Sequence, residues 1–348
     1  GGWYDSYARN TCESFTKLNS VKKSPQYLLM GPWTHGAYEA TYSGDLEFGL
    51  EAHINYNDLK LAWFDHTLKG LYTEVDNWGA VRIFTMGAGE GTVDENGRVK
   101  HGGRWRSEDG WPLDSTTPTS FHLRDGGGLT TDTPGFQDRS ETSFTFDPLS
   151  PVPTIGGGIS AGNPIMEPGG YDQRGDPSRF FGSKNGLRLN VRDDVVTFQT
   201  QPLEKDVEVT GPIEMHLWAS SSAVDTDFTA KVIDVYPPSP DLPEGLDINI
   251  TDSIIRARYR NGFQRPELMT EDEAYEFVFQ LYPTSNVFAK GHRIRLDISS
   301  SNWPRFDVNH NTGGSLGIDR TYKTARQAIY HSADCPSHIV LPIQPGQI

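Results

Sequence analysis

The sequence predicts a short α/β segment followed by a larger, strand-rich β-sandwich. The first observation is the length of 348 residues, which suits two domains at ~100–200 residues per domain. The second is the composition, because 36 Gly and 23 Pro favour a turn-rich β architecture over a helical bundle. The third is a change of the hydrophobic pattern near Asn77, from a helical repeat to the alternation of strands. We therefore expect one domain over 1–77 and a second over 78–348.

The first part combines helices with a buried strand. Residues 6–19 predict a short helix, and the apolar run 27–30, which stops at Gly31, is typical of a buried strand. Between residues 53 and 68 the apolar side chains recur on one face of a helix, and Gly70 beyond them suits its C-cap. Helix, strand, loop and helix in this order fit the last part of an α/β sheet domain.

The second part alternates apolar and polar residues in short runs bounded by Gly, Pro, Asp or Asn. The apolar positions are Val81/Ile83, Val207/Val209, Ile213/Met215/Leu217, Phe228/Ala230/Val232, Tyr275/Phe277/Phe279/Leu281 and Ile294/Leu296/Ile298. Each run predicts a strand with one buried face. Many such strands without helices between them indicate a β-sandwich of the jelly-roll type.

Charge and composition exclude several classes of function. A net charge of −15 argues against nucleic acid as a partner, because phosphate binding needs clustered Lys and Arg. No apolar run of ~20 residues is present, so we expect no membrane span. Cys12 and Cys335 are too few for a disulfide-built fold, and one bridge between them stays open. The histidines show no metal-ligand spacing, so we expect no metal.

The first residues predict that the chain is a fragment or a processed product. It opens Gly1-Gly2-Trp3 without Met and without a signal-like segment, as if a strand were entered halfway. We therefore assign no compartment, although the cytoplasm is favoured. The sequence allows a homo-oligomer but does not indicate one.

Two loop residues have the character of a catalytic acid and base. Asp5 lies in Gly-Trp-Tyr-Asp, and His35 lies in Gly-Pro-Trp-Thr-His-Gly directly after a predicted buried strand. In a nucleophilic hydrolase a carboxylate accepts the histidine Nδ1–H, and the imidazole takes a proton from a serine hydroxyl. An Asp followed thirty residues later by a His fits the chain order Ser, Asp, His. On spacing alone, the structural alternative of a turn Asp and an unrelated His is the more frequent one.

These segments resemble the triad-Asp and triad-His segments of the cocaine-esterase/X-Pro dipeptidyl-peptidase family of serine hydrolases. The resemblance is collinear over nearly the whole chain. It continues through Asp45-Leu46-Glu47-Phe48-Gly49, Trp63-Phe64-Asp65-His66-Thr67-Leu68-Lys69-Gly70, Val81-Arg82-Ile83-Phe84-Thr85-Met86-Gly87, Ser220-Ser221-Ser222-Ala223-Val224-Asp225-Thr226-Asp227-Phe228, Thr284-Ser285-Asn286-Val287-Phe288, Ser299-Ser300-Ser301-Asn302-Trp303-Pro304, Asn311-Thr312-Gly313-Gly314 and Pro336-Ser337-His338-Ile339-Val340-Leu341-Pro342.

The resemblance implies the C-terminal segment of an α/β-hydrolase domain over 1–77, followed by a jelly-roll (galactose-binding-like) β-sandwich over 78–348. It makes Asp5 the triad acid and His35 the triad base. The family's nucleophilic serine and oxyanion-hole donors lie upstream of its Gly-Trp-Tyr-Asp, so we expect these 348 residues alone to be inactive. The implied partner is a small-molecule ester or peptide, cleaved through an acyl-enzyme without any cofactor. An X-Pro-type dipeptidyl-peptidase or an acylase of β-lactams or amino-acid esters is the nearer alternative.

Other motifs have weaker functional interpretations. Gly313-Gly314-Ser315-Leu316-Gly317 matches G-x-S-x-G, but Ser315 follows a turn rather than a buried strand, so we expect a surface turn. Asp225 and Asp227 are too few oxygen donors for Ca²⁺, which favours a strand-entry turn. The loop 155–174 is a candidate for lining the acyl pocket. The alternative from another class is a non-catalytic carbohydrate-binding module, in which Trp105, Trp111 or Trp303 would form the platform.

Overall fold

The computed structural model describes residues 1–136, 140–162 and 165–348. Within these ranges the two α-helices are α1 (Ala8–Val21) and α2 (Tyr56–Lys69). The strands are β1 (Gly2–Tyr4), β2 (Leu28–Thr34), β3 (Tyr42–Ser43), β4 (Leu46–Glu47), β5 (Val81–Gly87), β6 (Val99–Lys100), β7 (Gly103–Glu108), β8 (Thr117–Arg124), β9 (Gly128–Thr130), β10 (Glu141–Phe146), β11 (Val196–Gln199), β12 (Val207–Ser221), β13 (Asp227–Tyr236), β14 (Leu246–Arg256), β15 (Tyr275–Phe288), β16 (Arg293–Ser299), β17 (Ala325–Tyr330) and β18 (His338–Ile343). Short 3₁₀ helices lie at Leu50–Ala52, Glu74–Asn77, Asp125–Gly127, Leu189–Val191 and Ala257–Tyr259.

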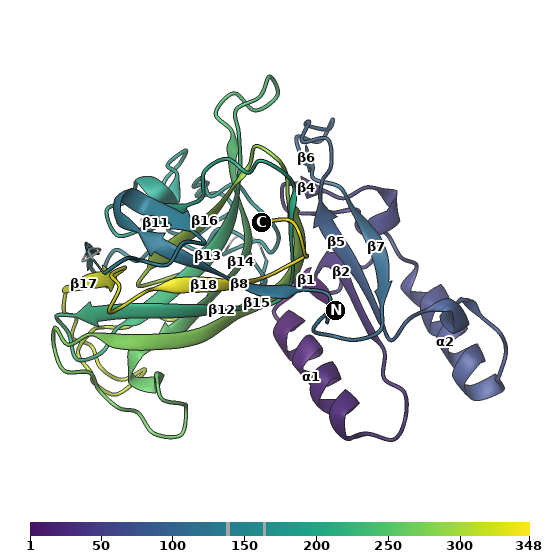
Figure 1. Ribbon diagram of the computed structural model, residues 1–348, viewed down its shortest axis with the longest axis horizontal. Helices are drawn as coiled ribbons and strands as arrows, with labels where there is room; N and C mark the ends of the chain where they lie inside the picture. Colours follow the sequence, from purple (N-terminus) through teal and green to yellow (C-terminus); the bar gives the residue numbers. More distant parts are fainter. Residues whose placement is uncertain (137–139, 163–164) are drawn as a thin grey trace.

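One large sheet organises almost the entire chain. Its strand order is β1-β2-β5-β15-β12-β18-β8-β9-β11-β16-β13-β14, with β7, β10 and β17 attached beside this path. The sheet is nearly closed. Its last strand in this order, β14, lies against β15, and Thr251 Oγ1 donates to the carbonyl of Tyr282 at 2.7 Å. Figure 1 shows both helices beside β1, β2, β5 and β7, away from the end where β17 lies.

The expected α/β-hydrolase segment followed by a separate jelly-roll sandwich is wrong as a description of this fold. The chain is almost all β, and a separate three-stranded sheet is formed by the short strands β3, β4 and β6. However, β1 and β2 do not form a sheet of their own. Instead β2 pairs in parallel with β5, which pairs in parallel with β15, so β1 and β2 extend the same sheet as the later strands. β5 forms hydrogen bonds with one edge of β2, so that edge is not available to a strand of a separate α/β sheet.

The individual N-terminal elements lie close to where the sequence places them. The helix expected over 6–19 is α1, and the helix expected over 53–68 is α2. The side chain of Asn55 caps α2 by accepting from the N–H groups of Asn57 and Asp58, and Gly70 ends it in the left-handed region at φ 68°. The apolar face of α2 is not buried, however: Leu61, Phe64 and Leu68 are 58%, 51% and 78% exposed.

The strands expected from alternation form the hydrophobic core. Ile213, Met215 and Leu217 of β12 are buried, as are Phe228 of β13 and Phe277 of β15, whose rings pack 4.9 Å apart. In the described ranges neither α-helix nor any shorter helix is long and apolar enough to cross a membrane. Cys12 and Cys335 are both free thiols.

A buried histidine ties the segment between β6 and β7 to the long strands. His101 Nε2 lies 2.8 Å from Asn286 Oδ1 on β15, and Nδ1 bonds the hydroxyl of Tyr236 on β13. The neutral ring satisfies both partners, donating to the amide oxygen and accepting from the phenol. Burial lowers the pKa of His101.

The burial of the neutral His101 ring predicts that the folded protein loses stability in mild acid. Because the folded pKa of His101 is depressed, the unfolded chain binds the proton more readily, and the His101 contribution falls as pH drops below about 6.5. The expected slope is at most about 1.4 kcal/mol per pH unit for this one proton. Urea unfolding of the parent protein and of His101→Gln at several pH values measures how the free energy of unfolding depends on pH. The variant should lose less stability on acidification, and parallel curves for the two proteins would contradict the assignment.

Candidate active site

Asp5 lies in the turn that joins β1 to α1. Its Oδ1 accepts from the N–H of Tyr7 at 3.0 Å, which fixes the carboxylate at the start of the helix. The side chain of Asp5 is only 5% exposed. Gly158 comes from far along the chain and lies against this turn, because a Cβ at that position would stand 3.1 Å from the Asp5 carbonyl oxygen.

His35 follows the last residue of β2. Since β1 and β2 are parallel neighbours, with Gly2 opposite Gly31 and Tyr4 opposite Thr34, the residues that follow the two strands meet at one edge of the sheet. His35 Nδ1 lies 3.1 Å from Asp5 Oδ2. The structure therefore brings together the two residues that the sequence marks as acid and base.

The two members of this pair differ in accessibility. Asp5 is enclosed, whereas the His35 side chain is 50% exposed and contacts the ring of Tyr7 at 5.2 Å between centroids. With its proton on Nδ1 the imidazole donates to Asp5, which leaves Nε2 as the proton acceptor. Within the described residues His35 Nε2 forms no hydrogen bond. A buried carboxylate that orients an imidazole with an open Nε2 is the arrangement that general-base catalysis requires.

The other motifs lie apart from this pair. Ser315 is exposed in a turn where its carbonyl accepts from the N–H of Asp319, and in the described ranges its hydroxyl forms no hydrogen bond with a histidine. His101 is used in the buried network described above. The loop 155–174 includes Gly158 beside Asp5, while its residues 163–164 lie outside the described residues.

Asp225 and Asp227 are held by arginines, which sequence reasoning missed. Asp225 accepts from Arg258 Nε at 2.8 Å, and Asp227 accepts from Arg256 Nε and Nη2 at 2.9 Å each. Asp227 and Arg256 lie opposite each other in the antiparallel pairing of β13 and β14. A prediction of this strand register would have identified the Asp227–Arg256 pair. In the described residues no cluster of three or more His, Cys, Asp or Glu is placed to hold a metal ion.

Sequence comparison identifies the family. Residues 73–340 match the family described as the X-Pro dipeptidyl-peptidase C-terminal non-catalytic domain. The chain belongs to this family. The resemblance to cocaine-esterase/X-Pro dipeptidyl-peptidase-like hydrolases is thereby confirmed, and Asp5 and His35 precede the matched range.

Members of this wider hydrolase group are similar along nearly the whole chain. Cocaine esterase from Rhodococcus sp. (strain MB1 Bresler) is 35% identical over 98% of this chain and 55% of its own length. An α-amino acid ester hydrolase has a TM-score of 0.80 at 27% identity, over 98% of this chain and 54% of that protein. An aminopeptidase from a marine sediment Thaumarchaeota archaeon, at 24% identity and a TM-score of 0.78 over 99% and 54%, shares the fold. The chain spans about half the length of the curated relatives it matches.

Proposed function

We propose that this chain supplies the acid and the base of a serine hydrolase that cleaves carboxylic esters through an acyl-enzyme. The observation that carries the proposal is the 3.1 Å contact between Nδ1 of the half-exposed His35 and the buried carboxylate of Asp5. The names of two relatives, a cocaine esterase and an α-amino acid ester hydrolase, support an ester substrate. The peptidase names of the family and of the aminopeptidase make cleavage of an amide bond the alternative. Both residues precede residues 73–340, the range that matches the domain described as non-catalytic.

In this mechanism the nucleophilic serine comes from outside these 348 residues. Its hydroxyl attacks the ester carbonyl while His35 Nε2 takes the proton, and the resulting imidazolium is stabilised by Asp5. His35 then returns the proton to the leaving alcohol as the carbon–oxygen bond breaks, which leaves an acyl-serine. A water molecule, deprotonated by the same Nε2, attacks the acyl group and releases the carboxylic acid and the serine. The proposed chemistry uses no metal or organic cofactor.

Active-site labelling tests where the nucleophile lies. A fluorophosphonate should label one serine in the full-length protein that contains this chain, and peptide mapping should place that serine outside residues 1–348. The 348-residue chain alone should remain unlabelled and hydrolyse p-nitrophenyl acetate no faster than buffer. Circular dichroism on the isolated chain controls for misfolding. Stoichiometric labelling of Ser315, abolished by Ser315→Ala, would refute the proposal.

A further inference from the structure

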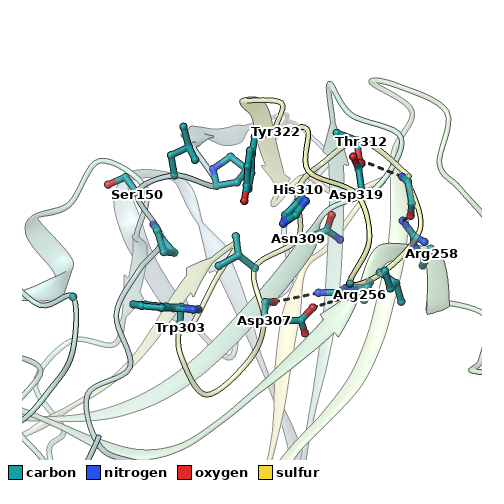
Figure 2. Close-up of a pocket in the computed structure, with 18 of the residues that line it drawn as sticks. Ser150, Arg256, Arg258, Trp303, Asp307, Asn309, His310, Thr312, Asp319 and Tyr322 are labelled. Carbon is teal, nitrogen blue, oxygen red and sulfur yellow. Dashed lines mark hydrogen bonds and ion pairs between the residues drawn. The ribbon is translucent and has the colours of Figure 1, made fainter. Parts of the chain in front are cut away.

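A concave site elsewhere in the chain includes neither Asp5 nor His35 in its lining. It is a hollow of about 720 Å³ near the C-terminal end of β14, covered by the segment between β16 and β17. We call it the Trp303 hollow, defined by Trp303, Tyr322, His310, Asp307, Arg256 and Arg258 (Figure 2). Its volume falls within the ~300–1,000 Å³ typical of small-molecule sites. None of the residues that the proposed hydrolysis uses lies in it.

Aromatic rings face this hollow from two directions. Trp303 lies on one side in Figure 2, and Tyr322 with His310 lies on another, their two rings 4.3 Å apart. Tyr322 is 49% exposed. Trp303 is half-buried: the ring of Phe181 lies 5.1 Å from the indole between centroids, and Gly182 packs so closely that a Cβ there would stand 3.2 Å from Trp303 Cζ3. Partly exposed aromatic faces accept the weakly positive C–H groups of a ligand.

Charged groups line the hollow together with these rings. The guanidinium of Arg256 is held by Asp227 and also contacts the carboxylate of Asp307 at 3.4 Å. That carboxylate is itself 80% exposed. Arg258 is held by Asp225 and donates to the carbonyl of Gly314 at 3.0 Å. A guanidinium donor beside an exposed carboxylate acceptor matches neighbouring hydroxyl groups, which both donate and accept hydrogen bonds.

The charge balance of the hollow does not favour an anion. Lys184, Arg192, Arg256 and Arg258 line it together with Asp307 and Asp319. Three of these four cations already form ion pairs with buried carboxylates. Arg256 pairs with Asp227, Arg258 pairs with Asp225, and Arg192 pairs with Asp194 at 2.7 Å. A phosphate or sulfate needs excess positive charge, which this arrangement lacks. A neutral ligand with many hydroxyl groups needs none.

We propose that the Trp303 hollow binds a neutral carbohydrate, with a sugar ring packed on Trp303 or Tyr322 and its hydroxyls bonded to Arg256 and Asp307. The combination of a half-exposed Tyr322 ring, the Trp303 indole in the lining, an adjacent donor and acceptor, and balanced charge carries this assignment. It is independent of the proposed hydrolysis. The hollow would hold the protein on a glycan without taking part in bond cleavage.

Saccharide titration tests the proposal on the whole chain. Maltopentaose, cellopentaose, xylopentaose and mannopentaose are the probes, with inorganic phosphate as the anionic comparison, followed by saturation-transfer NMR and calorimetry. At least one neutral saccharide should bind with a Kd of ~1 mM or tighter, and phosphate should not compete. Tyr322→Ala should weaken that binding by about tenfold or more, as expected for an aromatic anchor.

Matched variants make either outcome decisive. Tyr72→Ala removes a tyrosine that is 77% exposed elsewhere and should leave saccharide binding unchanged. Trp303→Ala should abolish binding, and if that variant unfolds, Tyr322→Ala alone decides. The absence of saccharide binding at about 10 mM would overturn the proposal. Saccharide binding that both Trp303→Ala and Tyr322→Ala retain would overturn it as well. Ester hydrolysis by the full-length protein should be unaffected by Tyr322→Ala, which separates this test from that of the active site.

Discussion

Replacing His35 by Ala should lower ester turnover by the full-length protein about 10³-fold or more, because acid, base and nucleophile act as one unit. The reason lies in the geometry of the pair. Asp5 Oδ2 lies 3.1 Å from Nδ1, and in the proposed mechanism Nε2 is the atom that takes the serine proton. Without the imidazole the hydroxyl remains protonated and the leaving alcohol receives no proton. Steady-state kinetics with p-nitrophenyl esters measures the effect, which should fall on kcat rather than on KM.

Two further variants test whether proton transfer depends on this pair alone. Asp5→Asn keeps the size of the side chain but disturbs the tautomer of His35, so it should reduce kcat by less than His35→Ala if the ring still finds a usable orientation. Ser315→Ala removes the hydroxyl of the exposed G-x-S-x-G turn and should leave turnover within about twofold, because among the described residues the side chains of Asp5 and His35 form no hydrogen bond with it. Full activity of a folded His35→Ala protein would remove the basis of the proposed mechanism.

Replacing Arg258 by Leu should destabilise the chain by about 3–5 kcal/mol, the cost of leaving a buried carboxylate without its cation. Asp225 is fully buried and Arg258 is only 8% exposed. After the substitution, Asp225 retains the backbone N–H of residue 258 at 2.9 Å and the amide of Asn309 at 2.9 Å, but loses the only cation bonded to it among the described residues. Urea denaturation at neutral pH measures the change in the free energy of unfolding.

An exposed ion pair and a double variant serve as controls for this prediction. Lys17 forms a helical pair with Glu13 at 3.3 Å and is 78% exposed, so Lys17→Ala should change stability by only about 0.5 kcal/mol or less. The double variant Asp225→Asn with Arg258→Leu removes the stranded charge and should be more stable than Arg258→Leu alone. Equal stability of the single and double variants would show that Asp225 is not held as a buried anion.

Local patterns in the sequence were sufficient for most individual elements. The alternation at Phe228, Ala230 and Val232 predicts a buried strand, and β13 contains all three. The repeat over 53–68 with Gly70 behind it predicts α2 and its left-handed C-cap. These features depend on neighbours within a few residues, because one turn of helix or two steps of strand decide which side chains share a face.

The sheet that these strands build was not predictable in the same way. A buried strand at 27–30 is compatible with an α/β domain or with any other parallel sheet, and the sequence does not state its neighbour. The neighbour of β2 is β5, which lies across the division expected at residue 77. The resemblance placed this segment in a hydrolase domain, whereas the backbone hydrogen bonds join it to the strand-rich remainder.

The sequence by itself determined the type of most segments and, through the Asp5 and His35 motifs, the candidates for acid and base. Only the tertiary structure decided that β1 and β2 are parallel neighbours, which places those two side chains 3.1 Å apart although thirty residues separate them. The tertiary structure also forms the Trp303 hollow, which is lined by segments near residues 150, 182, 256 and 310. The physical reason is that strand pairing and cavity lining depend on contacts between distant segments, whereas periodicity records only which face of one segment is apolar.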